Sequence, residues 1–296
     1  MADPSRTSFV IATRDRAGEL QRTLTQLLDT TDSPIVVVDN DSRDHTRELV
    51  ASTARSHPEG RRVELVALSR NRGAVARNIG VVACSTPYVA FCDDDSWWDP
   101  SATKIAEDLF DHRPTLALLA AQTVTWPGRQ RDGFSNMLEN SALGHEPGMP
   151  GPSVLGFQSC SSIVRACAFI AVGGFSPVLH FRGEEQLLAL DLATAGWDLC
   201  YCSELVAFHH PSHVRDSAAS QHARVLRNDF LTACMRRPSR RCINAAAALI
   251  RSAPNDRAYV RAAAEALFRL PSALAGRHRL PEHVERQVRL LESVPA

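Results

Sequence analysis

The sequence lacks the hydrophobic segments that would place a protein in or across a membrane. No apolar run approaches the ~20 residues that a membrane-spanning helix requires. The first residues also lack the hydrophobic region of a signal peptide, because the short apolar stretch Phe9–Ala12 runs directly into charged residues at 14–16. We therefore expect a cytoplasmic protein without a transmembrane segment.

The cysteines lack the C-x-x-C spacing that is typical of zinc sites. Several of them lie in apolar runs, which favours buried, reduced thiols over metal ligands. The eight cysteines are Cys84, Cys92, Cys160, Cys167, Cys200, Cys202, Cys234 and Cys242.

An excess of charge of one sign is also missing, since 33 Lys and Arg residues balance 33 Asp and Glu residues. Global charge gives no reason to expect nucleic acid as the partner, so any anion-binding site must be local. The length of 296 residues suffices for one large domain, or for a domain with a helical appendage.

The first hundred residues alternate short apolar runs with helical patterns. Expected strands cover residues 8–12, 35–39, 63–68 and 88–92, and expected helices cover 17–28, 74–83 and a segment from a cap at Asp41 or Ser42 to about Ser56. This rhythm predicts right-handed crossovers and an α/β fold with a mainly parallel central sheet flanked by helices.

The rest of the chain is less regular. We expect a helix over 101–112, a strand over 116–125, a strand over 161–164, helices ending at Gly173–Gly174 and Gly196, and short strands over 199–202 and 206–209. The segment 126–158 is rich in Pro and Gly, which is typical of a functional lid or a disordered insertion. From Ser217 the pattern predicts a C-terminal helical extension, with breaks at Pro238, Pro254, Pro271 and Pro281.

Three adjacent carboxylates, Asp93, Asp94 and Asp95, directly follow the expected strand 88–92. They repel one another unless a cation neutralises them, and ligands of open parallel sheets bind beyond the carboxyl ends of the strands. Carboxylate oxygens suit Mg²⁺ or Mn²⁺, which would then bridge to a diphosphate. The alternative is an acidic turn that caps a helix.

Polar residues follow the other three strands at the same edge of the sheet. Asp39 could accept from a base or a ribose hydroxyl, although it could instead cap a helix. Contacts with phosphate or base could come from the segment Thr13–Arg16, above all from Thr13 and Arg14. They could also come from Arg72, which lies beside the conformationally permissive Gly73, and from Arg77. Solvated surface charge is the alternative for these arginines.

The order SFVIATRDR, IVVVDNDSRDHT, SRNRGAVARNIG and FCDDDSWWDP resembles glycosyltransferase family 2, as does the later GGF followed by RGEEQLL, across residues 8–212. The resemblance implies the GT-A fold, inversion at the anomeric carbon and a divalent cation. By this resemblance, Asp39 would contact the base and Asp94 would lie near the ribose or sugar. Asp93 and Asp95 match the family's D-x-D motif, in which Asp95 would hold the metal. Arg72 matches a basic position of the family. ATRDR lacks the aromatic of the family's commoner P-T-Y-N-R form.

The resemblance also implies a carboxylate base, which the family usually supplies from the second acid of a pair at a helix start. Here the pair is Glu184–Glu185, so we expect Glu185 to be the base, with Glu184 as the alternative. Both acids could instead only complement the N-terminus of a helix.

Other candidates have weaker signals. His209 or His210 could complete the metal site or touch phosphate, or lie at a strand end. Trp97 and Trp98 could stack on an acceptor ring, or pack in the core. The Arg-rich C-terminal helices could contact an anionic membrane surface, or form a packed appendage with a charged outer face.

These observations predict a glycosyltransferase that moves a sugar from a nucleotide-diphosphate donor to an acceptor hydroxyl, with UDP-sugar favoured and dTDP- or GDP-sugar possible. The expected division is a catalytic domain over 1–215, with halves 1–100 and 101–215, followed by the extension 216–296. One alternative is a nucleotidyltransferase, although its Gly-rich phosphate loop is missing because only Gly18 follows the first strand. The other is a sugar-nucleotide-binding protein without catalysis.

Overall fold

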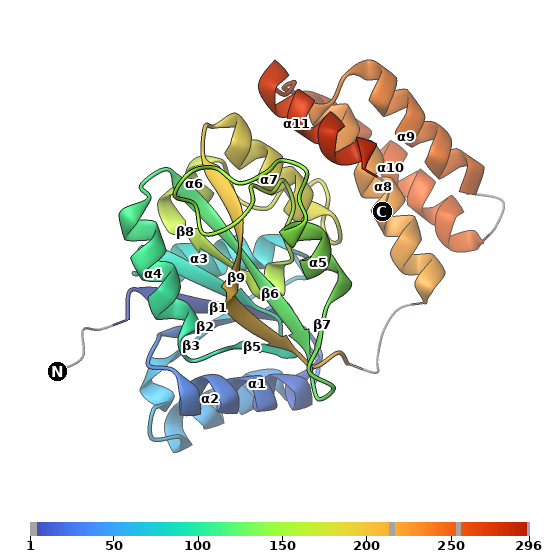
Figure 1. Cartoon of the computed structure of the whole chain (residues 1–296). Helices are drawn as coiled ribbons and strands as arrows, with labels where there is room; N and C mark the ends of the chain where they lie inside the picture. The colour runs from blue at the N-terminus through green and yellow to red at the C-terminus, as the bar shows by residue number, and fades with distance from the viewer. Residues whose placement is uncertain (1–4, 213–216, 253–255, 295–296) are drawn as a thin grey trace.

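A computed structural model describes residues 5–212, 217–252 and 256–294 (Figure 1). Its first half forms the predicted parallel sheet, with the strands β1 (Thr7–Thr13), β2 (Ile35–Asp39), β3 (Val63–Ala67) and β4 (Tyr88–Cys92) in the order β3-β2-β1-β4. All five residues of β2 are buried, because helices cover both faces of the sheet. The intervening helices are α1 (Ala17–Thr30), α2 (Thr46–Ser56) and α3 (Val75–Ala83), with a 3-10 turn at Gly60–Arg62 before β3.

The start of α2 differs from the expected cap. The helix begins at Thr46, and Asp44 accepts a hydrogen bond from the Thr46 backbone at 3.0 Å. The same carboxylate accepts from the backbone of Ala17 at the start of α1, at 3.1 Å. Asp41 and Ser42 therefore precede the helix rather than cap it.

The second half adds strands of mixed direction to the same sheet. The full order is β3-β2-β1-β4-β8-β6-β9-β5, with β7 (Gln130–Arg131) paired to β6 (Leu116–Thr125). Strand β8 (Ser162–Arg165) runs antiparallel to both β4 and β6, and β5 (Ser96–Trp98) runs antiparallel to β9 (Asp198–His209). The sheet therefore continues past β4, and β5 places the residues after the aspartates in a strand that the sequence did not predict.

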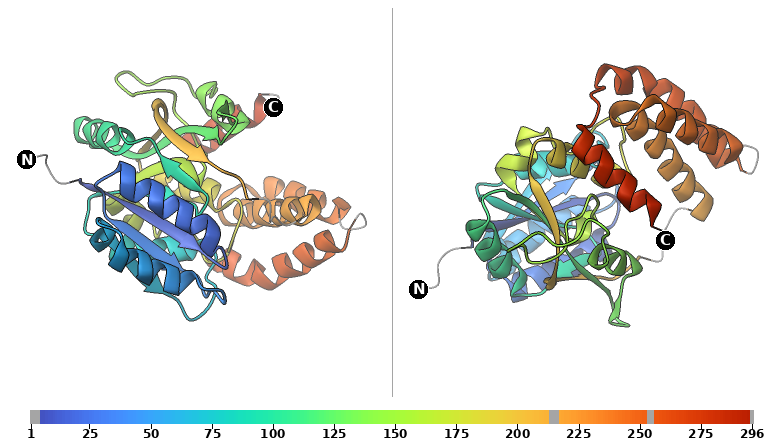
Figure 2. Two further views of the ribbon diagram at one scale, coloured as in Figure 1. Left: turned by 90° about the horizontal axis from the view of Figure 1, so that it is seen from below. Right: turned by 45° about the horizontal axis from the view of Figure 1, so that its top comes forward.

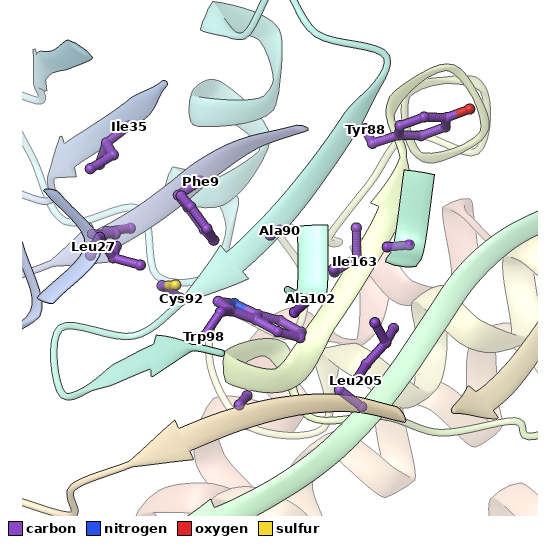
Figure 3. Packing of buried hydrophobic residues seen from close by; sticks show 14 of the residues in the cluster. Phe9, Leu27, Ile35, Tyr88, Ala90, Cys92, Trp98, Ala102, Ile163 and Leu205 are labelled. Atoms are coloured by element: carbon purple, nitrogen blue, oxygen red, sulfur yellow. The ribbon is translucent and has the colours of Figure 1, made fainter. Parts of the chain in front are cut away.

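Two hydrophobic cores lie on opposite faces of the sheet, as the alternation of side chains along a strand requires. Phe9 and Ile11 face α1, α2 and α4 (Ala102–His112), whereas Val10 faces α3, α6 (Ala166–Ala171) and α7 (Glu184–Thr194). Figure 3 shows the first core, in which Trp98 lies between Cys92 and Leu205. This packing fixes the strand ends that carry the acidic residues.

The structure adds detail to two expectations about the second half. The segments 199–202 and 206–209 form one strand, β9, whose pairing with β6 shifts register between Ala121 and Gln122. The segment 126–158 contains β7 and the helix α5 (Gly133–Glu139), so part of it has regular structure. A 3-10 turn, Ser159–Ser161, then leads into β8.

The predicted C-terminal helices are confirmed, and they stand beside the sheet (Figure 2). They are α8 (Ala218–Arg236), α9 (Ser239–Ser252), α10 (Arg257–Ala275) and α11 (Glu282–Ser293). Pro271 lies inside α10 rather than ending a helix. The expected break at Pro254 and the expected domain boundary at 215–216 lie outside the described residues.

The extension is anchored to the rest of the chain by apolar and ionic contacts. Leu187 of α7 shares a core with α8 and α10, and Leu190 packs with Val284 of α11. Arg236 binds Asp191 of α7, with its Nε atom 2.5 Å from the carboxylate. Because both partners of this pair are largely buried, the pair fixes the position of α8 against α7.

Within the described ranges, every helix is too short or too polar to cross a bilayer. The eight cysteines are free, and five of them are buried as expected. Cys167 is exposed, because it lies on the outer side of the short helix α6.

Candidate active site

The carboxyl ends of β1, β2 and β4 bring five of the predicted residues to one edge of the sheet. Thr13 pairs with Asp39 in the register of β1 and β2, and the aspartates 93–95 follow β4 on the other side of β1. The Thr13 hydroxyl donates to Oδ2 of Asp94 at 2.8 Å. The predicted convergence at this edge is therefore a real contact between neighbouring strand ends.

Arg16 bridges two of the aspartates. Its guanidinium nitrogens lie 3.2 Å from Oδ1 of Asp94 and 3.2 Å from Oδ2 of Asp95. Burial raises the pKa of Asp94 to about 7, and the charge of Arg16 only partly offsets this. The sequence favoured Arg14, which is exposed and reaches the backbone oxygen of Asp41 at 3.4 Å instead.

Asp95 also contacts the end of β9. Nε2 of His209 lies 3.3 Å from its Oδ1, and the backbone nitrogen of Ser212 donates to its Oδ2 at 3.2 Å. Burial acts to raise the pKa of Asp95, but the hydrogen bond and charge of His209, together with Arg16 and Ser212, outweigh it and lower that pKa. His210 meets Asp95 through its backbone, which donates to the Asp95 carbonyl oxygen at 2.8 Å.

A carboxylate and an imidazole side by side suit part of a divalent metal site. Mg²⁺ and Mn²⁺ are commonly bound by one or two carboxylates, with substrate phosphates and water as the remaining ligands. The described residues contain no group of three or more His, Cys, Asp or Glu side chains arranged to hold an ion. The pair Asp95–His209 therefore fits a site that a bound diphosphate would complete.

Asp93 lies apart from this pair. Its Oδ1 is 2.5 Å from Nη2 of Arg77, a side chain that is only 6% exposed. Burial acts to lower the pKa of Arg77, but the negative charges of Asp93, Glu184 and Glu185 outweigh it and raise that pKa. Asp93 is thus an ion-pair partner of Arg77, and its predicted place among the metal ligands stays a prediction.

Glu184 and Glu185 begin α7 but have different surroundings. Glu184 is 1% exposed, and its Oε2 has no hydrogen-bond partner among the residues that the structure describes. Burial, together with the charge of Glu185, raises the pKa of Glu184 to about 8. Glu185 is half-buried, and its Oε1 accepts from the Ser159 hydroxyl at 2.9 Å. Of the two acids, only Glu185 is accessible to a ligand.

Asp39 is fully buried and already engaged. Nε of Arg47 lies 2.5 Å from its Oδ2, and the backbone nitrogen of Ser42 donates to its Oδ1 at 3.2 Å. Arg47 was not singled out from the sequence, although it follows in the same motif, IVVVDNDSRDHTR. Arg47 is 41% exposed, so the pair presents a cationic group where the sequence predicted a free carboxylate.

Asn40 holds the loop that carries Arg72. Its Oδ1 accepts from the Arg72 backbone at 2.7 Å, and its Nδ2 donates to the Gly73 carbonyl oxygen at 3.2 Å. Gly73 has φ +60°, and a Cβ there would lie 2.1 Å from the backbone oxygen of His180. The side chain of Arg72 is exposed. Asn40 was missed because its role depends on a loop that begins 32 residues further along the chain, for which the sequence carries no local signal.

The two tryptophans, Trp97 and Trp98, differ in their exposure and in their contacts. Trp98 has no exposed surface, and its indole nitrogen donates to the Phe91 carbonyl oxygen at 3.0 Å, which favours the core packing that the sequence left open for one of the two tryptophans. Trp97 is half-buried and lies across the strand pair from Phe208, with ring centroids 5.8 Å apart, and 5.9 Å from the ring of Trp126. These three rings line a cavity of about 620 Å³ beside Asp95.

Comparison with known proteins identifies the family. The sequence pattern of the family described as Glycosyl transferase family 2 matches residues 8–170. The chain belongs to glycosyl transferase family 2. A curated relative, the "Pre-mycofactocin glycosyltransferase" of Mycobacterium tuberculosis (strain CDC 1551 / Oshkosh), is 33% identical over 158 residues. This match covers 48% of the chain, and the chain spans only 31% of the relative's length.

Solved structures support the GT-A fold that this family implies. "S. aureus TarS 1-349 in complex with UDP-GlcNAc" is similar with a TM-score of 0.56 and 17% identity, over 76% of this chain and 66% of that one. "Mannosyltransferase PcManGT from Pyrobaculum calidifontis in complex with GDP-Man and Mn2+" has a TM-score of 0.61 and 20% identity, over 97% and 84%. At these identities the likeness shows the fold alone.

The family 2 match covers only part of the site. It includes the strand ends with Asp39 and the aspartates 93–95, but it stops before α7 and β9. The matched pattern therefore gives no support to the predicted roles of Glu184, Glu185 and His209, which depend on the geometry of this chain alone.

Proposed function

We propose that this family 2 protein transfers a sugar from a nucleotide-diphosphate donor to an acceptor hydroxyl, with inversion at the anomeric carbon. One observation carries the proposal. Arg16 lies 3.2 Å from the carboxylates of both Asp94 and Asp95, and Nε2 of His209 lies 3.3 Å from Asp95. The acids that follow β4 and the end of β9 therefore meet at one edge of the sheet, which suits a metal bound together with a diphosphate.

The donor would lie along the edge formed by β1, β2 and β4. The nucleotide would meet Asp39 with its partner Arg47, the exposed Arg72, and Thr13 and Arg14. Asp94 would approach the ribose or the sugar, while Arg77 would act through Asp93. UDP-sugar is the favoured donor, with GDP- or dTDP-sugar as alternatives; the similar structures hold UDP-GlcNAc in one case and GDP-Man in another.

Asp95 and His209 would hold Mg²⁺ or Mn²⁺. The bound ion supplies positive charge that stabilises the departing diphosphate. Arg16, at the N-cap of α1, already contributes one positive charge beside Asp94 and Asp95. The low pKa of Asp95 keeps its carboxylate ionised for this role at neutral pH.

Glu185 would take the proton from the acceptor hydroxyl. Its half-buried position allows contact with a substrate, and the Ser159 hydroxyl orients its carboxylate through Oε1. Glu184, which is 1% exposed, would not touch the acceptor. Trp97 would contact the acceptor in the cavity beside Asp95. The eight free cysteines fit a reducing compartment, so we place the reaction in the cytoplasm.

The proposal is tested by incubating the protein with UDP-, GDP- and dTDP-sugars and Mn²⁺ and measuring the release of nucleoside diphosphate. We expect release that EDTA abolishes and that Asp95→Asn reduces by about 10³-fold, since a metal contributes several kcal/mol to such a transition state. A saturating nucleoside diphosphate, at 100 times its dissociation constant, should stabilise the fold by about 2.7 kcal/mol.

Other outcomes would contradict the proposal. Stabilisation by a nucleoside diphosphate without any release would indicate a binding protein. Formation of pyrophosphate from a nucleoside triphosphate and a sugar phosphate would indicate a nucleotidyltransferase. Full activity of Asp95→Asn, with its melting temperature unchanged, would exclude the metal role of that residue.

A further inference from the structure

The outer face of α10 is apolar and largely exposed in the chain as described. Val260, Leu267, Phe268 and Leu274 are 56%, 68%, 87% and 50% exposed. Their spacing places them on one side of the helix, opposite the buried Ala262, Ala266 and Ala273, which pack in the core of the extension. The helix therefore packs its alanines against the core of the extension and presents larger apolar side chains on its exposed side.

Two arginines border this outer face. Arg257 and Arg261 lie at the Phe268 side of the stripe by helical spacing, and both are exposed. The Arg261 side chain is 82% exposed, and its pair with Glu265 is a surface pair within one helix, which leaves the guanidinium accessible. Large apolar side chains next to exposed arginines are typical of helices that lie in the interface of a membrane.

The whole extension carries a net positive charge, like the two arginines beside the apolar stripe. Residues 217–296 contain 14 arginines and six acidic residues, a net charge of +8, whereas the full chain is neutral. The remaining residues 1–216 therefore carry a net charge of −8. An anionic surface would attract the extension and repel the catalytic half, which orients the molecule with α10 toward that surface.

We propose that the outer face of α10 docks the protein on an anionic lipid membrane. Phe268 and Leu267 enter the boundary between headgroups and acyl chains, and Arg257 and Arg261 contact the lipid phosphates. A second copy of the chain is a poorer occupant, because pairing two such faces would bring the arginines of both copies together. The inference does not depend on which sugar or acceptor the active site uses.

Flotation of the full-length protein with vesicles tests the inference. We expect binding to vesicles of equimolar phosphatidylcholine and phosphatidylglycerol, weak binding to phosphatidylcholine alone, and release as salt rises from about 0.05 M to about 0.5 M. Leu267→Ser with Phe268→Ser should weaken binding about tenfold or more, because two large apolar side chains no longer leave water. Arg257→Gln with Arg261→Gln should weaken binding to the anionic vesicles alone, by about fivefold for each arginine.

Val82→Ser is the matched control. Val82 is 73% exposed on α3, far from the extension in sequence, and its replacement should leave vesicle binding unchanged. Melting temperatures equal to that of the wild type would show that the variants fold, and nucleoside diphosphate release would show that the active site is intact. Failure of the wild type to bind anionic vesicles, or undiminished binding by the Leu267/Phe268 variant, would overturn the inference. A lipid-free dimer that this variant abolishes would assign the face to a second copy instead.

Discussion

Nη2 of Arg16 lies 3.2 Å from Oδ2 of Asp95, while His209 contacts the other oxygen of the same carboxylate at 3.3 Å. The acid that would hold the metal is therefore shared between a cation from α1 and an imidazole from β9. Arg16 also neutralises Asp94, so it balances part of the charge of the acidic cluster within the chain itself.

Replacing Arg16 should expose that charge. In Arg16→Gln, two adjacent carboxylates lose their cationic partner, and we expect Mn²⁺ to bind several-fold more tightly in the absence of nucleotide. Electron paramagnetic resonance of free Mn²⁺ measures this directly. Arg55→Gln, at an exposed position in the last turn of α2, is the control and should leave Mn²⁺ binding unchanged. Weaker Mn²⁺ binding by Arg16→Gln would show that Arg16 supports the site rather than competes for it.

Glu185→Gln should separate binding from turnover. The amide cannot take a proton, so we expect kcat to fall about 10²- to 10⁴-fold, the usual contribution of a positioned base. The donor contacts on the other side of the site remain, so nucleoside diphosphate should stabilise the variant as it does the wild type. Glu184→Gln is the comparison, and we expect it to retain most of kcat. The reverse result, with Glu184→Gln inactive and Glu185→Gln active, would move the base by one residue.

The buried Glu184 should make stability depend on pH. Its folded-state pKa, raised to about 8 by burial and by Glu185, lies above that of the unfolded chain. Its contribution to stability is thus fully present below pH 4.5 and is lost as pH rises through 8. Glu184→Gln removes this dependence, and its stability advantage over the wild type should grow by on the order of 3 kcal/mol between pH 5 and 9.

Urea unfolding of both proteins across that range measures the difference. Glu48→Gln changes an exposed acid in the first turn of α2, so its free energy of unfolding should vary with pH as that of the wild type does. A Glu184→Gln curve that is also parallel to the wild type would show that Glu184 titrates normally.

Gly73→Ala should destabilise the loop that carries Arg72. Gly73 has a positive φ, and an added Cβ would lie 2.1 Å from a backbone oxygen that cannot move freely. We expect a loss of about 2 kcal/mol or more in the free energy of unfolding, seen as a lower melting temperature. Gly18→Ala is the control, because a Cβ there meets no atom within 4 Å, so that variant should be neutral or slightly more stable. Equal melting temperatures of the two variants would contradict the role of this turn.

Local patterns in the sequence were sufficient for the first half of the fold. Short β-branched runs alternating with amphipathic segments specify parallel strands joined by helices, and consecutive parallel strands end at the same edge of a sheet. The contact between Thr13 and Asp94 follows from that rule, because each residue comes at the end of its strand. The acidic pair at the start of α7 was also visible as a local pattern.

Pairing partners and side-chain burial were decided only in three dimensions. The sequence could not show that Asp93 turns to Arg77 while Asp95 turns to Arg16 and His209, because adjacent residues point in different directions and their partners come from distant elements. It could not distinguish Trp97 from Trp98 either, since neighbours in a strand face opposite sides and the strand β5 had no signal of its own. Sequence thus determined which residues reach the edge of the sheet, and packing determined which of them meet, because burial and orientation depend on elements far apart in the chain.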